Sequence, residues 1–164
     1  MYKDRIKPGP GQESVWDYPR PPRLEASLRR VRIEFAGRLI ADTREAFRVL
    51  ETSHPPTYYI PPGDIDESVL EVSDLHSYCE WKGQADYRHL RLGERQSRNA
   101  AWLYPDPVPA FAPLAGYLSF YPSRVDACWL DEERIEAPEG DFYGGWISSD
   151  IVGPFKGPPG SQGW

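Results

Sequence analysis

Proline is the feature that most constrains this chain, because 18 of its 164 residues are proline and another 14 are glycine. The proline share is about twice the average for soluble proteins. Proline has no backbone N–H and ends or kinks a helix, whereas both residue types are common in turns. This content favours an all-β protein with many loops over a helical bundle.

Between the prolines and glycines lie short segments in which apolar and polar side chains alternate. In residues 31–35 (VRIEF) apolar and charged side chains alternate, which predicts a half-buried strand. Ala36-Gly37 then predicts a turn, and residues 38–41 predict the partner strand of a β-hairpin. Further strands are predicted over residues 44–50, 57–60, 69–72, 85–92, 95–103, 117–121 and 125–130. A short helix over residues 44–50 is the alternative there, and we expect the strand.

These segments predict one compact domain of about eight short strands, arranged as a β barrel or as packed sheets. Residues 1–28 form a proline-rich N-terminal arm, residues 29–137 the all-β core domain, and residues 138–164 a Gly/Pro-rich C-terminal strap. Trp16 and Tyr18 give the arm large apolar surfaces, so we expect it to pack on the domain or on a second subunit. A homodimer through the arm or the strap is therefore one expected kind of partner.

The charge, the apolar runs and the cysteines of the chain argue against several classes of protein. With 25 acidic and 19 basic residues the formal net charge is −6, which argues against general nucleic-acid binding. No apolar run is long enough to span a membrane, and nothing resembles a cleavable signal peptide. Cys79 and Cys128 do not make a disulfide framework. We therefore expect a cytoplasmic protein with reduced thiols and no cofactor.

Residues 75–83 (LHSYCEWKG) combine reactive and aromatic side chains more densely than any other segment. A cation near Cys79 would make it a nucleophile or a redox thiol, and Lys82 or His54 are the candidates to tune it. Residues three apart on a strand point to opposite faces, so Lys82 reaches Cys79 only if the chain turns near Glu80. The alternative is that Cys79 is a small buried apolar residue beside Trp81.

A ligand-binding pocket is the other prediction for this segment. Lys82 beside an aromatic wall would attract a carboxylate or a phosphate, although a solvated turn lysine is the alternative. Tyr58 and Tyr59 alternate along a strand, so one of them faces inward. The predicted binding residues for a small polar or anionic metabolite are His54, Tyr59, Trp81, Lys82 and Trp102, with Cys79 beside them.

Metal binding is not predicted. Structural zinc takes four Cys or His ligands at close spacing, and this chain has two lone cysteines. His76 and Cys79 would need two further ligands from distant parts of the chain. Neither a Gly-x-Ser-x-Gly segment nor a P-loop occurs.

Several segments resemble the domain of unknown function 427 family in order and spacing. The segments are VRIEFAGRLIADT, HPPTYYIPPGDI, SYCEWKGQADY, AAWLYPDP and AGYLSFYPSRVDA, and the similarity extends over roughly residues 14–160. Tyr58–Pro61 and the Cys-x-Trp-Lys-Gly of Cys79–Gly83 are the most specific parts. The resemblance implies an all-β domain related in shape to the Mss4-like, or β-tent, folds.

Some classifications attach a nucleotidyltransferase label to this family. Such an enzyme needs a Gly-Ser turn that holds phosphate, followed closely by paired carboxylates that hold Mg²⁺. The single Gly-Ser, at Gly160-Ser161, has no carboxylate after it, and Asp64 and Asp66 have no phosphate-binding turn before them. Nucleotidyl transfer is therefore not expected.

Overall fold

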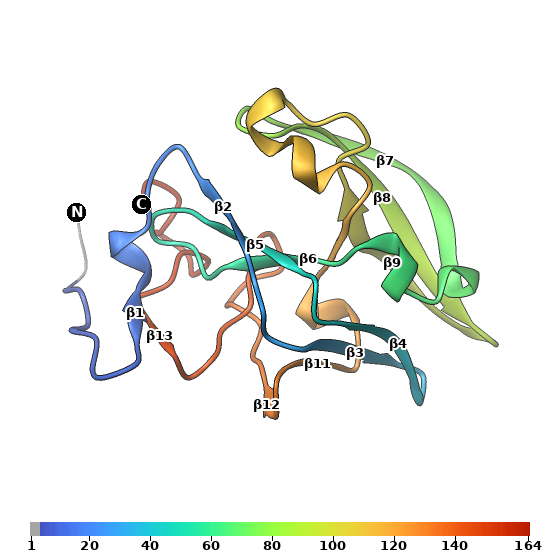
Figure 1. Ribbon diagram of the computed structural model, residues 1–164, viewed down its shortest axis with the longest axis horizontal. Helices are drawn as coiled ribbons and strands as arrows, with labels where there is room; N and C mark the ends of the chain where they lie inside the picture. The colour runs from blue at the N-terminus through green and yellow to red at the C-terminus, as the bar shows by residue number, and fades with distance from the viewer. Residues whose placement is uncertain (1–3) are drawn as a thin grey trace.

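The computed structural model describes residues 4–164, and most of their regular structure is β (Figure 1). Residues 1–3 of the predicted arm lie outside the described residues. The strands are β1 (Glu13–Ser14), β2 (Arg23–Ala26), β3 (Val31–Phe35), β4 (Arg38–Thr43), β5 (Phe47–Leu50), β6 (Thr57–Tyr59), β7 (Leu70–Cys79), β8 (Gly83–Leu92), β9 (Arg95–Leu103), β10 (Leu118–Phe120), β11 (Ala127–Leu130), β12 (Glu133–Arg134) and β13 (Ile151–Val152). Short 3-10 helices are η1 (Val15–Asp17), η2 (Pro62–Asp64), η3 (Glu67–Val69), η4 (Pro109–Leu114) and η5 (Pro122–Arg124). The all-β prediction is confirmed.

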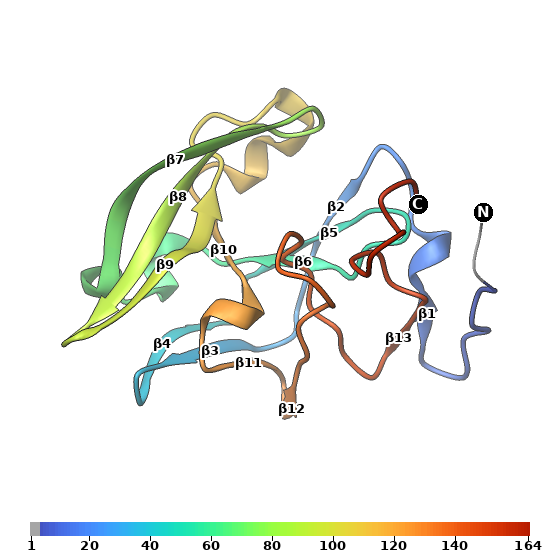
Figure 2. The ribbon, with the colours of Figure 1, turned by 180° about the vertical axis from the view of Figure 1, so that it is seen from behind.

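The strands form two four-stranded sheets and two smaller ones (Figures 1 and 2). One large sheet has the order β10-β9-β8-β7 and the other the order β12-β11-β3-β4. The three-stranded sheet β2-β5-β6 runs between them, and β1 pairs with β13 in parallel. None of the sheets in residues 4–164 closes into a barrel, so packed sheets are the arrangement adopted. The relation to the β-tent folds stays a prediction.

Two backbone hydrogen bonds join the three-stranded sheet to the large sheet of β7–β10. The N–H of Ile60 donates to the carbonyl of Leu118 over 2.8 Å, and the N–H of Leu118 donates back to Ile60 over 2.9 Å. Ile60 directly follows β6, whose last residue is Tyr59. This connection fixes the position of Tyr59 relative to the sheet of β7–β10.

The main hydrophobic core follows from the alternation in β3. Val31, Ile33 and Phe35 are fully buried, while Arg32 and Glu34 between them are partly exposed. Burying apolar surface stabilises the fold by about 25 cal/mol for each Å² removed from water. Alternate side chains of one strand therefore fix which face of the sheet turns inward.

The arm and the strap pack against each other and against the domain. A separate cluster of buried apolar residues joins them, formed by Val15, Trp16, Tyr18, Leu50 and Ile151. The indole N–H of Trp16 donates to the carbonyl of Pro154 over 2.8 Å. Arg23–Ala26, within the segment predicted to be an irregular arm, forms β2 because it pairs with the distant strand β5.

Strand β7 is longer than the predicted segment of residues 69–72. It extends to Cys79 because it pairs with β8 along most of its length, apart from an irregularity between Val72 and His76. Its residues from Asp74 to Tyr78 are all exposed, so buried and exposed positions do not alternate in this part of the strand. The sheet order places β7 at an edge.

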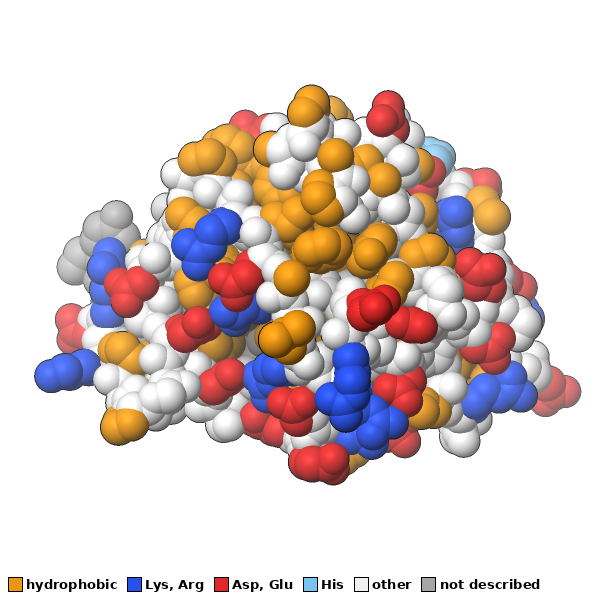
Figure 3. Space-filling view, viewed as in Figure 1, with side chains coloured by type: hydrophobic (Ala, Val, Ile, Leu, Met, Phe, Trp, Pro, Cys, Tyr) orange, Lys and Arg blue, Asp and Glu red, His pale blue; other side chains and the backbone are white. Residues whose placement is uncertain are grey.

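Apolar and charged side chains separate on the surface (Figure 3). Apolar side chains gather on the face where the η4 segment approaches β5 and β6, and charged ones gather toward the edge formed by β11 and β12. None of the helices among residues 4–164 has the length and the hydropathy needed to span a bilayer.

Candidate functional site

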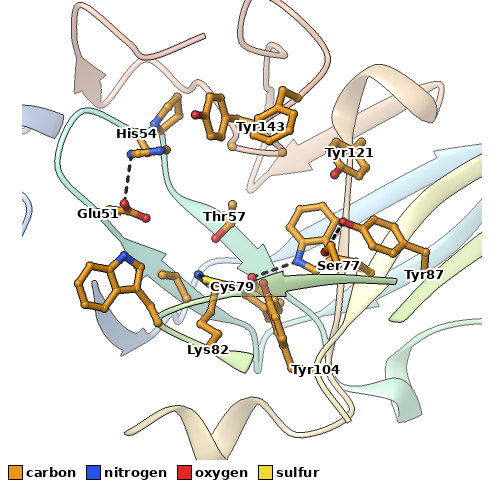
Figure 4. Close-up of a pocket in the computed structure, with 18 of the residues that line it drawn as sticks. Glu51, His54, Thr57, Ser77, Cys79, Lys82, Tyr87, Tyr104, Tyr121 and Tyr143 are labelled. Carbon is orange, nitrogen blue, oxygen red and sulfur yellow. Dashed lines mark hydrogen bonds and ion pairs between the residues drawn. The ribbon is translucent and has the colours of Figure 1, made fainter. Parts of the chain in front are cut away.

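A pocket of about 570 Å³ lies between the sheet of β7–β9, the end of β5 and the strap (Figure 4). This volume is within the usual range of small-molecule sites, about 300–1,000 Å³. Strands β7 and β9 and the β7–β8 turn line one side, and residues 49–59 line another. Residues 141–145 of the strap complete the wall.

The structure brings all of the predicted site residues together. The pocket is lined by His54, Tyr59, Cys79, Trp81, Lys82 and Trp102. They come from three separate parts of the chain, residues 54–59, residues 79–82 and Trp102, so the fold is responsible for their convergence. That any of them binds a ligand or reacts stays a prediction.

The turn between β7 and β8 places Lys82 beside Cys79. The N–H of Lys82 donates to the carbonyl of Cys79 over 3.2 Å, and Gly83 completes the reversal with a φ of 117°, which favours glycine. As a result the Nζ atom of Lys82 donates to Sγ of Cys79 over 3.6 Å. The chain turns at Glu80 and Trp81, so the opposite-face geometry of a straight strand does not apply.

Lys82 is a buried cation without a carboxylate partner. Its side chain lies within the pocket wall at 8% relative exposure, and residues 4–164 contribute no ion pair to it. Its Nζ lies 5.7 Å from the ring centroid of Phe111 and 5.8 Å from that of Tyr104. Burial alone lowers the pKa of Lys82, but Tyr59, Cys79 and Glu51 together raise that pKa above its ordinary value. The amine is therefore a protonated hydrogen-bond donor at neutral pH.

Aromatic side chains with polar tips form the floor of the pocket. The indole N–H of Trp102 donates to the hydroxyl of Tyr59 over 3.3 Å, with the two rings nearly perpendicular. Burial raises the pKa of Tyr104, so its hydroxyl stays neutral. These rings offer apolar surface, while the hydroxyls of Tyr59 and Tyr104 keep polar atoms near Lys82.

Nδ1 of His54 has a hydrogen-bond partner, and Nε2 has none among residues 4–164. Its Nδ1 lies 2.8 Å from the carbonyl oxygen of Thr52, which only accepts, so Nδ1 carries the hydrogen. Burial lowers the pKa of His54, although Glu51, at 3.9 Å from Nδ1, acts in the opposite direction. The ring is therefore neutral at pH 7 and Nε2 is a hydrogen-bond acceptor. The ring of Tyr143 packs edge-on against it at 5.0 Å (Figure 4).

The strap wall was not predicted from the sequence. A Cβ added to Gly144 would lie 2.3 Å from Cη2 of Trp102, and one added to Gly145 would lie 2.5 Å from the carbonyl oxygen of Pro55. The backbone therefore approaches both residues more closely than a side chain allows. The Gly144-Gly145 pair before Trp146, in an otherwise irregular segment, is the sequence signal for such an approach.

Two charged residues at the pocket's other side, Arg124 and Asp141, neutralise each other. Arg124 forms an ion pair with Asp141 over 2.8 Å, and its guanidinium lies 4.1 Å from the ring centroid of Tyr121. The hydroxyls of Ser77 and Tyr87 are hydrogen-bonded to each other over 2.9 Å. Arg124 thus has a carboxylate partner, whereas none of residues 4–164 provides one for Lys82.

The carboxylates suggested by the nucleotidyltransferase label have structural partners. Asp64 accepts a hydrogen bond from Thr43 over 2.7 Å, and Asp66 forms an ion pair with Arg38 over 3.1 Å. Asp66 also accepts the backbone N–H of Ser68 at the start of η3. Among the residues that the structure describes, no group of three or more His, Cys, Asp or Glu side chains is placed to hold a metal ion.

A family model described as a domain of unknown function (DUF427) matches residues 23–131. No curated protein matches the chain. The matched span includes all six predicted site residues but not residues 141–145 of the strap. One wall of the pocket therefore comes from a segment outside the matched domain.

Proposed function

The chain belongs to the DUF427 family, as its motifs predicted, and we propose that it binds a small polar or anionic metabolite in the pocket around Lys82. The family describes a domain without an assigned activity, so the proposal rests on the pocket itself. The all-β fold supplies a rigid frame, and its β-tent relationship stays part of this proposal.

The observation that carries the proposal is the buried ammonium of Lys82. A buried charge is costly unless it has a partner of opposite charge. Lys82 has the Cys79 thiol and two ring faces, but no described carboxylate lies within ion-pair distance. A carboxylate or phosphate bound in the pocket would supply the missing charge. The surrounding tyrosines and tryptophans would pack against the rest of the ligand.

Benzoate and benzamide test the charge requirement, because they have the same shape and differ in charge. Titrations followed by isothermal calorimetry should show benzoate binding more tightly than benzamide to the wild-type protein. Lys82→Met keeps most of the buried stem but removes the charge, so it should abolish the preference for benzoate. Lys7→Met, which removes a lysine outside the pocket, is the matched control and should leave the preference intact. Equal binding of both probes to the wild type, or an unchanged preference in Lys82→Met, would contradict the proposal.

The contact between Lys82 and Cys79 supports a second candidate, an enzyme with Cys79 as nucleophile or redox thiol. An ammonium 3.6 Å from Sγ stabilises negative charge on sulfur, and Nε2 of His54, in the same pocket, has no partner in the part of the chain that the structure describes. The absence of a hydrogen bond between His54 and Cys79 among the described residues makes this the weaker candidate. The reactivity of Cys79 separates the two functions.

Two further expectations belong to this proposal. A cytoplasmic location agrees with Cys79 and Cys128 both being free thiols. Association of two copies through the arm or the strap is tested by sedimentation velocity. A single monomer-sized species at all protein concentrations would contradict it.

A further inference from the structure

Leu75, Tyr78 and Phe142 are exposed apolar side chains that line the Lys82 pocket, and nothing in the proposed function uses them. Leu75 on β7 is 45% exposed and Phe142 on the strap is 78% exposed, and both line the pocket. Exposed apolar surface at the edge of a pocket often belongs to a binding site. These two residues face a pocket whose inner wall holds a buried cation.

Leu75 lies on the pocket-facing side of its strand. Ser77 is hydrogen-bonded to Tyr87 across the sheet, and Cys79 lines the pocket two residues further on. Leu75 also lines the pocket, although it lies in the irregular part of the β7–β8 pairing, where strict alternation does not apply. Its exposure therefore reflects the open mouth of the pocket and not the outer face of β7.

Phe142 reaches the mouth from the opposite side. It packs edge-on against Tyr143, with ring centroids 4.8 Å apart, and Tyr143 in turn packs on His54. The strap thus holds Phe142 beside the pocket while leaving most of its ring in water. A single exposed aromatic is ordinary on a protein surface, but one that continues an aromatic-lined pocket extends the apolar path outward.

The inner wall of the pocket therefore carries a buried cation, whereas the walls that lead to the mouth are mainly apolar. Lys82, at 8% exposure, supplies positive charge at the buried end. The rings of Tyr59, Tyr104 and Trp102 supply apolar walls, and Leu75 and Phe142 continue them to solvent. The other charged residues of the lining add no net charge, because Arg124 pairs with Asp141, Glu51 pairs with Arg20, and Glu80 and Lys156 have opposite charges.

From this gradient we infer that the ligand is an amphiphilic anion, with a carboxylate or similar head at Lys82 and an apolar body that reaches the mouth. The inference rests on the proposed anion site and specifies its ligand class. Each methylene group that enters the apolar part of the pocket should tighten binding about fourfold. A purely polar metabolite would gain nothing from Leu75 and Phe142.

A series of straight-chain carboxylates tests the inference: butanoate, hexanoate, octanoate and decanoate, each titrated by calorimetry. Affinity should rise with chain length in the wild-type protein. The double variant Leu75→Ser/Phe142→Ser should weaken decanoate by about threefold to tenfold and leave butanoate within twofold. Val72→Ser is the matched control, because Val72 is an apolar residue of β7 with 77% exposure that does not line the pocket. It should change no affinity in the series.

The outcomes separate this inference from the proposed function. Carboxylates of all lengths that bind equally well, and only when Lys82 is present, would overturn the amphiphilic ligand and leave the anion site standing. A length dependence that the double variant does not reduce would also overturn it, because the apolar chain would then bind elsewhere. Benzoate binding through Lys82 without any binding of the straight-chain series would also overturn the amphiphilic ligand and leave the anion site standing. Binding that is unaffected by Lys82→Met would overturn both proposals.

Discussion

The Nζ atom of Lys82 lies 3.6 Å from the Sγ atom of Cys79, across the turn that joins β7 to β8. The second cysteine of the chain has a different environment. Cys128 is 1% exposed within the main hydrophobic core, and burial raises its pKa far above the ordinary value. The two thiols therefore provide an internal comparison within one molecule.

Iodoacetamide should label Cys79 and leave Cys128 unmodified in the folded protein. Lys82→Met should slow the labelling of Cys79 about tenfold, because the ammonium that stabilises the attacking thiolate is lost. Peptide mass spectrometry after timed labelling assigns the rate to each cysteine. Labelling of Cys79 that Lys82→Met does not change would remove the support for a catalytic thiol, and the binding function would remain.

The free energy of unfolding should depend on the protonation of His54. Its pKa is lowered by burial from the ordinary value of 6.5, so the unfolded chain takes up a proton at a pH where the folded protein does not. The native state therefore loses stability as the pH falls from 6.5 toward the lowered pKa, and this loss ends below it. Urea titrations at pH 8 and pH 5 should show a smaller decrease for His54→Gln than for the wild type. An equal decrease in both proteins would contradict the burial of a neutral His54.

Gly144→Ala should destabilise the strap. The added Cβ would meet the ring of Trp102 at 2.3 Å, so the ring or the strap must move, at a cost of about 1–3 kcal/mol. Gly163→Ala is the control, because its Cβ would meet no atom within 4 Å. Chemical denaturation measures both, and the tryptophan emission of the folded state reports on Trp102. Equal stability of the two variants would show that the strap does not press on Trp102.

Trp146 should hold the strap in place. It is fully buried, and its indole N–H donates to the carbonyl of Phe120 over 3.1 Å. Trp146→Ala should cost about 3–5 kcal/mol of unfolding free energy. Trp146→Phe should cost about 1–3 kcal/mol, because the carbonyl of Phe120 then lacks its donor. Phe142→Ala, at an exposed aromatic of the same strap, should change stability by less than about 0.5 kcal/mol. A Trp146→Ala variant as stable as Phe142→Ala would contradict this role.

Local patterns predicted the strands that have one clear buried face. The segment 31–35 forms β3 as predicted, because every second side chain is apolar and enters the core. The segment 44–50 contains β5 and not the alternative helix, because Phe47–Leu50 pairs with strands on both sides. Strand β2 was missed, since its pairing with β5 is a long-range contact and prolines precede it.

The candidate site was predictable in part. Cys79, Trp81 and Lys82 lie in one unusual segment, so their proximity followed from the sequence. Their meeting with Tyr59 and Trp102 depends on how separate sheets are joined, and the strap wall depends on the burial of Trp146. Gly/Pro-rich segments have no side-chain period, so their positions are set by individual anchors that a sequence pattern does not reveal.

The paired hydrogen bonds between Ile60 and Leu118 also constrain how the pocket exchanges its contents. They make the strands that carry Tyr59 and Trp102 one continuous unit, so these two walls cannot separate by a hinge between sheets without breaking both bonds. Residues 141–145, which lack regular structure, are attached beside the pocket by the anchor of Trp146 and by close glycine contacts. The rates at which a ligand enters and leaves should therefore follow the local fluctuations of the strap and be insensitive to the rigidity of the β framework.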